Sequence, residues 1–341
     1  MVRLNLRCWA LPAAGTMLVV VVLAAMGVGA VSIGMADVVH ALFAPVASTL
    51  HATILWEVRV PRVLLAAAVG AVLAGCGVLM QALFRNPLAD PGLIGVSSGA
   101  ALGAVTVIVL GAGWLSHSPW QPVLVPVGAF AGAVAATLLV LRLAGGSSAD
   151  VTQLLLCGLA LNALVGACIG LLIFLATDEQ LRALTFWTLG SLAAATWQAA
   201  AVGVTGLLLA LLGLLMTRSL DALLLGEAEA RHLGVSVASL KRRLLWLTAA
   251  AAGAAVSVTG IIGFVGLVAP HMARLLVGPS HRHALPLSMV LGALLVVIAD
   301  TAARTLARPA EIPLGVLTAL VGVPFFFALL QRRRKHLEHT G

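Results

Sequence analysis

Long apolar stretches dominate this chain and leave it few choices of fold. A run of about twenty residues with almost no charge is long enough for a helix to cross a bilayer. Such runs can be placed at 13–34, 60–84, 93–112, 122–143, 152–176, 197–216, 242–263, 266–278, 286–300 and 312–330. The run at 266–278 is short and lies between glycine and proline breaks. We therefore predict an all-α fold, a polytopic membrane protein of about ten transmembrane helices.

Composition excludes a soluble globular protein. Of the 341 residues, 61% are hydrophobic and only 9% are charged, whereas a soluble domain carries about 25% charged residues. The first apolar run follows a short basic segment with Arg3 and Arg7, as a secretory signal would. Because this run is long enough to span and many spans follow it, we expect it to be retained as the first helix.

Small residues within the predicted spans favour close helix packing, because lipid provides no hydrophobic force between helices. Gly70, Gly75 and Gly77 mark one such face. The four cysteines show no metal-binding spacing, and three of them lie inside apolar runs: Cys8, Cys76, Cys157 and Cys168. We interpret them as packing residues and expect neither a metal site nor a disulfide.

The distribution of positive charge predicts the orientation. An even number of spans puts both termini on one side, and cytoplasmic termini place most of the 20 Lys and Arg residues in the cytoplasm. The remainder fall on the outer side: Arg59, Arg62, Arg182, Arg304 and Arg308. This bias has the sign that the positive-inside rule requires. We expect a multi-pass protein of the bacterial inner membrane whose net charge of +8 reflects sidedness in the lipid bilayer, with no nucleic acid as partner.

Several motifs that carry chemistry are missing. Neither lysine, Lys241 or Lys335, follows a glycine, so the chain has no GxxxxGK[ST] loop for ATP. It also has no HExxH motif and no Cys/His cluster. Asp300 is the only candidate for an intramembrane acid of the kind that binds a coupling ion. A membrane-embedded enzyme and an ion-coupled secondary transporter are therefore the less favoured alternatives.

Two polar loops stand out on the predicted cytoplasmic side. Residues 85–91, reading RNPLADP, break the chain between the second and third spans; they form either an ordinary connection or a functional turn. The loop at about 218–243 contains Glu227 and Arg231 at i, i+4, and Gly234 can end the short helix on which they lie. This helix is either a surface offered to a cytoplasmic partner or a solvated loop element.

The third unusual region lies on the predicted outer side. Arg59 and Arg62 flank Pro61 at the start of the second span, and Arg304 follows the ninth. Exposed arginines suit carboxylates because the guanidinium is a planar fork of donors, so they could anchor an acidic partner. The alternative is that each arginine anchors its helix at the membrane interface.

These motifs together resemble a known family. Residues 58–62 (VRVPR), 70–77, Gln81, 85–91 and 95–99, then 263–271 (GFVGLVAPH), Arg274, Gly278, 281–282, Asp300, Arg304 and 311–313 carry the resemblance. They are similar to the permease subunits of ATP-binding-cassette (ABC) importers for iron-siderophores, haem and vitamin B12, the FecCD-like type II importers. The resemblance covers residues from about 55 to 330.

This resemblance implies a single transmembrane permease domain over residues 1–341, with a cytoplasmic coupling loop at about 218–240. It implies a homodimer, two cytoplasmic ABC ATPase subunits that bind ATP and Mg, and a periplasmic substrate-binding protein. The chain itself would be no enzyme and would hold no cofactor. Transport would proceed by alternating access.

The resemblance also assigns roles to particular residues. Those that resemble the ATPase-coupling helix are Gly226, Glu227, Ala230, Arg231, Leu233 and Gly234. Those that resemble the arginines that grip acidic residues of the binding protein are Arg59, Arg62 and Arg304. Those that resemble the cytoplasmic gate are Asn86, Leu88, Ser147 and Ser148.

The substrate is predicted from one run. Residues 86–103, reading NPLADPGLIGVSSGAALG, look most like the haem importers, so haem is the expected substrate. Neighbouring siderophore permeases share much of this run, so a ferric siderophore or vitamin B12 stays an alternative. His271 belongs to the family-wide Pro-His pair, which favours a structural role over haem ligation.

Overall fold

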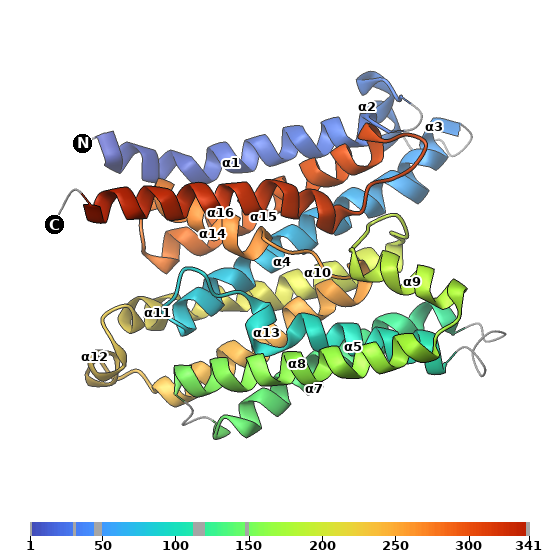
Figure 1. Cartoon of the computed structure of the whole chain (residues 1–341). Coiled ribbons are helices and arrows are strands. Elements are labelled where there is room, and N and C mark those ends of the chain that lie inside the picture. Colours follow the sequence, from blue (N-terminus) through green and yellow to red (C-terminus); the bar gives the residue numbers. More distant parts are fainter. Residues whose placement is uncertain (1, 30–31, 44–49, 112–119, 147–149, 339–341) are drawn as a thin grey trace.

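The computed structural model describes residues 2–29, 32–43, 50–111, 120–146 and 150–338, whose regular elements are all helical (Figure 1). The longer helices are α1 (Val2–Gly27), α4 (Val60–Leu83), α5 (Val96–Leu110), α7 (Gln121–Leu143), α8 (Val151–Leu175), α10 (Trp197–Leu211), α13 (Val237–Thr259), α14 (Val265–Val277), α15 (His281–Leu306) and α16 (Leu314–Glu338). The shorter elements are α2 (Met35–Phe43), α3 (Leu50–Thr53), η1 (Ile54–Arg59), η2 (Pro91–Ile94), α9 (Asp178–Thr188), η4 (Leu212–Met216), α11 (Thr217–Leu223) and α12 (Glu227–His232).

Each predicted apolar stretch holds one of the longer helices, so the all-α prediction is confirmed. The predicted ends differ in places, because polar residues at a helix end still make helical hydrogen bonds. The run at 286–300 extends in both directions to form α15, and the one at 242–263 begins earlier, at Val237. Within the described ranges, six helical segments are long and apolar enough to cross a membrane: Trp9–Gly27, Leu50–Leu83, Val123–Leu143, Val151–Leu175, Trp197–Leu223 and His281–Leu306.

Helix α4 is the centre of the bundle and packs against α10, α13, α14 and α15. Its small residues allow this. A Cβ added at Gly70 would lie 2.2 Å from the carbonyl oxygen of Gly292 on α15, and one at Gly77 would lie 2.1 Å from that of Gly266 on α14. Only glycine permits backbones to approach so closely. The predicted glycine face of α4 is therefore confirmed.

Helix α8 shows the opposite packing. It lies at the edge of the bundle, against α5, α7 and η2, and large apolar side chains along it are exposed, including Leu159, Leu164 and Phe174. A Cβ added at Gly158 would lie 1.9 Å from the carbonyl oxygen of Leu93, and Asn162 donates to the carbonyl oxygen of Gly92 (3.2 Å). An apolar surface of this kind suits lipid or a second membrane-embedded chain.

The bundle has two ends (Figure 1). Helix α1 begins, and α16 ends, at the end that carries α12, which we call the α12 end. The opposite end carries α2, α3 and α9 together with Arg59, Arg62 and Arg304, and we call it the arginine end. Helices α4 and α15 run antiparallel between the two ends, since the start of α4 meets the last turns of α15. That both termini share one end fits the prediction; the side of the membrane they face stays a prediction.

Candidate functional site

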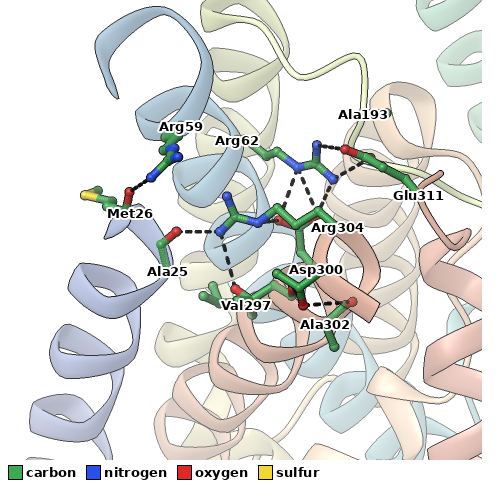
Figure 2. A network of polar contacts seen from close by, with 12 residues as sticks. Ala25, Met26, Arg59, Arg62, Ala193, Val297, Asp300, Ala302, Arg304 and Glu311 are labelled. Atoms are coloured by element: carbon green, nitrogen blue, oxygen red, sulfur yellow. Dashed lines mark hydrogen bonds and ion pairs between the residues drawn. The ribbon is translucent and has the colours of Figure 1, made fainter. Parts of the chain in front are cut away.

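Arg62, in the first turn of α4, is held between two carboxylates at the arginine end (Figure 2). Its Nε and Nη2 donate to Asp300 Oδ1 on α15, at 3.0 and 2.9 Å. Its Nη1 and Nη2 donate to Glu311 Oε1 and Oε2, at 3.0 and 2.9 Å. These are two bidentate, charge-assisted contacts, the strongest class of side-chain hydrogen bond. They fasten the start of α4 to the end of α15.

Arg59 and Arg304 both bind the C-terminal end of α1. Arg59 Nη1 donates to the carbonyl oxygen of Met26, and Arg304 Nη2 donates to that of Ala25 (Figure 2). The last carbonyl groups of a helix have no partner within it, and a cation there also compensates the negative end of the helix dipole. Arg304 Nε also lies 3.6 Å from Asp300 Oδ2. The two arginines thus stabilise the C-terminus of α1 and attach it to η1 and α15.

Burial of these arginines corrects the sequence interpretation. We expected exposed side chains, but Arg59, Arg62 and Arg304 are only 4%, 7% and 8% exposed. The reason is that their partners come from α1, from α15 and from the segment that follows it. Sequence windows cannot detect such partners, although a single acid in an apolar helix, Asp300, was a signal that a cation should lie near it. A role of the three arginines in binding another protein stays a prediction.

A depression of about 600 Å³ opens over this network. Its lining includes the three buried arginines, Glu311 and Arg308. Arg308 is exposed, in contrast to the other three. Four arginines against Asp300 and Glu311 leave an excess of positive charge, so the surface is chemically suited to an acidic partner.

Helix α12 forms where the predicted short helix was expected. Gly226 precedes it with φ of 122°, and Gly234 follows it with φ of 83°, a backbone conformation that favours glycine. Ala230 is fully buried and holds the helix against the bundle, whereas Arg231 and Leu233 are exposed. The prediction of a short helix with a glycine exit is confirmed, and its position makes it a protrusion from the α12 end (Figure 1).

Glu227 lies at the centre of the charges on this protrusion. Its carboxylate is 3.3 Å from Arg231 Nη2, at i, i+4, and 2.7 Å from Lys241 Nζ at the start of α13. A groove of about 390 Å³ runs between α12 and α13 past these residues. Because one carboxylate faces two cations, this groove also carries an excess of positive charge.

A contact that the sequence did not reveal joins this region to α15. Asp221 of α11 accepts a hydrogen bond from the backbone N–H of His281 (2.7 Å), lies 2.8 Å from His281 Nδ1, and accepts from the hydroxyl of Ser280 (3.0 Å). Ser280 is the N-cap of α15 but makes no cap hydrogen bond with its own side chain. Asp221 thus supplies from another helix the acceptor that an N-cap normally provides.

The candidate gate loop lies between α4 and η2. Asn86 Oδ1 accepts a hydrogen bond from the backbone N–H of Leu88 (2.9 Å), which makes a tight turn. Leu88, which is 40% exposed, faces a small cavity that Phe264, His271 and Phe325 also line. The other two predicted gate residues, Ser147 and Ser148, lie outside the described residues.

Asp90 ends this loop and begins η2. Its Oδ1 accepts a hydrogen bond from the backbone N–H of Gly92 (2.9 Å), so it acts as the N-cap. Burial raises the pKa of the Asp90 carboxyl, and this effect outweighs the hydrogen bonds from the backbone N–H groups of Gly92 and Leu93, which lower it. The loop therefore holds a carboxylate whose ionised form is less favoured than it would be in water.

Comparison with known families decides the class of protein. Residues 17–332 match the model of the FecCD transport family. The chain belongs to this family. Its members are permease subunits of ABC transporters rather than enzymes, and together with the apolar helices this makes the chain a multi-pass membrane permease.

Individual relatives agree with the family. The chain is 46% identical to the hemin transport system permease protein HmuU of Yersinia pestis, over 82% of this chain and 83% of the relative. It is 42% identical to the cobalamin import system permease protein BtuC of Halobacterium salinarum, over 82% of this chain and 74% of the relative. Among solved structures, it resembles an inward-facing conformation of a metal-chelate type ABC transporter, with a TM-score of 0.83 and 33% identity over 94% of this chain and 98% of the other.

Proposed function

We propose that this FecCD-family chain is the permease subunit of an ATP-driven importer that moves haem from the periplasm to the cytoplasm. The observation that carries the proposal is the 46% identity to a hemin transport permease over 82% of the chain. Haem is an iron chelate, and the similarity to a metal-chelate type transporter supports the same class of substrate. Haem is here the cargo and not a cofactor of the chain.

The proposed assembly follows from the family. Two copies of the chain surround one pathway, with residues 1–341 of each copy acting as a single permease domain, and two ABC ATPase subunits on the cytoplasmic side bind ATP and Mg. A periplasmic binding protein delivers the cargo. In this arrangement a second copy would cover the exposed apolar face of α8, which in a single copy faces lipid.

The candidate sites divide among these partners. Helix α12, with Gly226 before it and Gly234 after it, docks on the ATPase and transmits its closure. The arginine end receives acidic residues of the binding protein, attracted by the positive depression that Arg59, Arg62 and Arg304 line. The loop with Asn86 and Leu88, together with Ser147 and Ser148, forms the gate nearest the α12 end. Both termini then lie in the cytoplasm.

An ion-coupled mechanism is less well supported by the geometry. A coupling ion needs an intramembrane carboxylate that is free to bind it. Asp300 is the acid that the sequence offered for this task, and both its oxygens lie within hydrogen-bond distance of Arg62 Nε. Its charge is neutralised within the chain.

The test is ATP-dependent uptake into proteoliposomes that hold this chain with its ATPase and binding protein. Haem, a ferric siderophore and cobalamin are supplied in parallel. We expect uptake of haem that requires ATP and the binding protein. Uptake of cobalamin or of the siderophore alone would keep the importer and replace its cargo.

Cobalamin is the second candidate cargo, because the 42% identical relative is a cobalamin import permease.

Uptake that continues without ATP but follows an ion gradient would contradict the ABC mechanism. ATP hydrolysis by the ATPase subunit purified without the permease assigns the hydrolytic activity to the partner subunit.

A further inference from the structure

The guanidinium of Arg62 has no edge left for a partner. Arginine carries five N–H donors in a planar fork, which offers one bidentate edge at Nε and Nη2 and another at Nη1 and Nη2. Asp300 occupies the first edge and Glu311 the second. A carboxylate from another protein can therefore bind Arg62 in bidentate fashion only if one of these two acids leaves.

The two acids differ in their freedom to leave. The Asp300 side chain is 3% exposed, lies on α15 and contacts Arg304 as well as Arg62. The Glu311 side chain is 38% exposed and lies on the segment between α15 and α16, where it lines the depression. Ordered packing holds Asp300 in place, whereas Glu311 borders solvent and can rotate into water once another carboxylate takes its place on Arg62.

From this geometry we propose that Glu311 is an internal competitor for the acidic side chain of the binding protein. In the undocked permease, Glu311 occupies the outward edge of Arg62. On docking, a carboxylate of the partner takes that edge and Glu311 turns outward, toward Arg308 or solvent. This inference rests on the proposed function, because it specifies how a binding protein engages the arginine end.

The exchange explains how a buried arginine can serve as a docking residue. Removing a carboxylate from a buried guanidinium without replacement would leave an uncompensated charge, which is costly. Replacing one carboxylate with another keeps the charge paired throughout. The exposed Arg308 at the rim of the same depression supplies the long-range attraction that brings an acidic partner to the site.

The test measures docking of the fluorescently labelled binding protein on the permease–ATPase complex in nanodiscs. Glu311→Gln removes the competing charge, and we expect docking to tighten by roughly 2- to 5-fold, the range of a partly exposed ion pair. Glu311→Asp, which shortens the side chain, should tighten docking less. Glu57→Gln is the matched control, because Glu57 is exposed on η1 near the arginine end and its loss changes the net charge equally.

A second measurement does not need the binding protein. Phenylglyoxal modifies accessible guanidinium groups, and mass spectrometry reports the rate at each arginine. We expect Arg62 to react faster in Glu311→Gln than in the unmodified chain or in Glu57→Gln. The gain in docking should disappear in an Arg62→Gln background, since the competition requires Arg62.

Each outcome has one meaning. Equal docking of the Glu311→Gln and Glu57→Gln variants, or a gain that persists without Arg62, would overturn the competition. Unchanged reactivity of Arg62 in Glu311→Gln would overturn it as well. If the unmodified permease fails to dock while Glu311→Gln raises the reactivity of Arg62, the failure lies in the proposed function, because Glu311 then shields Arg62 without a binding protein to displace it.

Discussion

The two ends of the bundle handle charge in opposite ways. At the arginine end, Arg62 and Asp300 are buried and bind each other across 238 residues of sequence. At the α12 end, Glu227 and Arg231 pair across one helical turn, and the Arg231 side chain is 64% exposed. The first pair joins two helices, α4 and α15, while the second lies within one helix, α12.

This difference determines how each end can engage a partner. A buried, fully bonded arginine must exchange a ligand before it binds anything else, so docking there is coupled to a rearrangement. The exposed Arg231 side chain, on a short helix with a glycine at either end, is ready for contact without rearrangement. We therefore expect substitutions at the arginine end to change stability strongly and binding indirectly, and substitutions on α12 to change binding directly and stability little.

Asp300→Asn should have the largest effect. It leaves Arg62 and Arg304 buried without their shared carboxylate, and breaking a buried pair costs about 3–5 kcal/mol of unfolding free energy. We expect a marked fall in the apparent unfolding temperature of the purified protein in detergent, measured by a fluorescence scan. Asp178→Asn, at the exposed start of α9, is the control and should change it little.

A near-normal unfolding temperature in Asp300→Asn would show that Glu311 alone neutralises the buried arginines. The phenylglyoxal reactivity of Arg62 in the same variant then shows whether the guanidinium has turned outward.

Asp221→Ala should have an intermediate effect. The carboxylate is partly exposed but supplies acceptors to Ser280 and His281 at the start of α15, and His281 is only 1% exposed. Loss of these hydrogen bonds should cost about 1–3 kcal/mol. The same unfolding scan measures it. A cost as large as that of Asp300→Asn would show that the α12 end depends on a buried polar network as strongly as the arginine end does.

The sequence predicted the helices well, because apolar runs and glycine exits are local signals. The α4 glycine face and α12 could be predicted from residues within one or two turns of each other. The environment of Arg59, Arg62 and Arg304 could not, since their partners lie on α1, on α15 and at Glu311, far along the chain. From their neighbours in sequence alone we expected these arginine side chains to be exposed, because an arginine at a helix end usually reaches the membrane surface. Asp221 was missed for the same reason, since its partner is 60 residues away.

Asp90 is a half-buried carboxylate whose pKa is raised by burial, which outweighs the lowering by hydrogen bonds from the backbone N–H groups of Gly92 and Leu93. Its protonated form stabilises the fold fully below the unfolded pKa, and that contribution is lost as the pH rises through the higher folded value. Asp90→Asn keeps the acceptor for Gly92 and removes the charge. Near pH 7 we expect an equal or higher unfolding temperature, with a gain in unfolding free energy of up to about 1 kcal/mol. Unfolding scans at several pH values should show a weaker pH dependence of the unfolding temperature. A clear loss of stability near neutral pH would contradict this account.

Arg231→Ala should have the smallest effect on stability and separates the two ends most clearly. An exposed i, i+4 pair contributes about 0.3–0.5 kcal/mol, and Glu227 keeps Lys241 as a partner, so the unfolding temperature should hardly change. If α12 is the surface for the ATPase, co-purification of the ATPase and ATP-dependent uptake should nevertheless fall. Arg182→Ala, at another exposed arginine, on α9, should leave both unchanged. Unchanged co-purification in Arg231→Ala would remove Arg231 from the contact, and lost stability would show that α12 is held by its surface charges rather than by Ala230 and its flanking glycines.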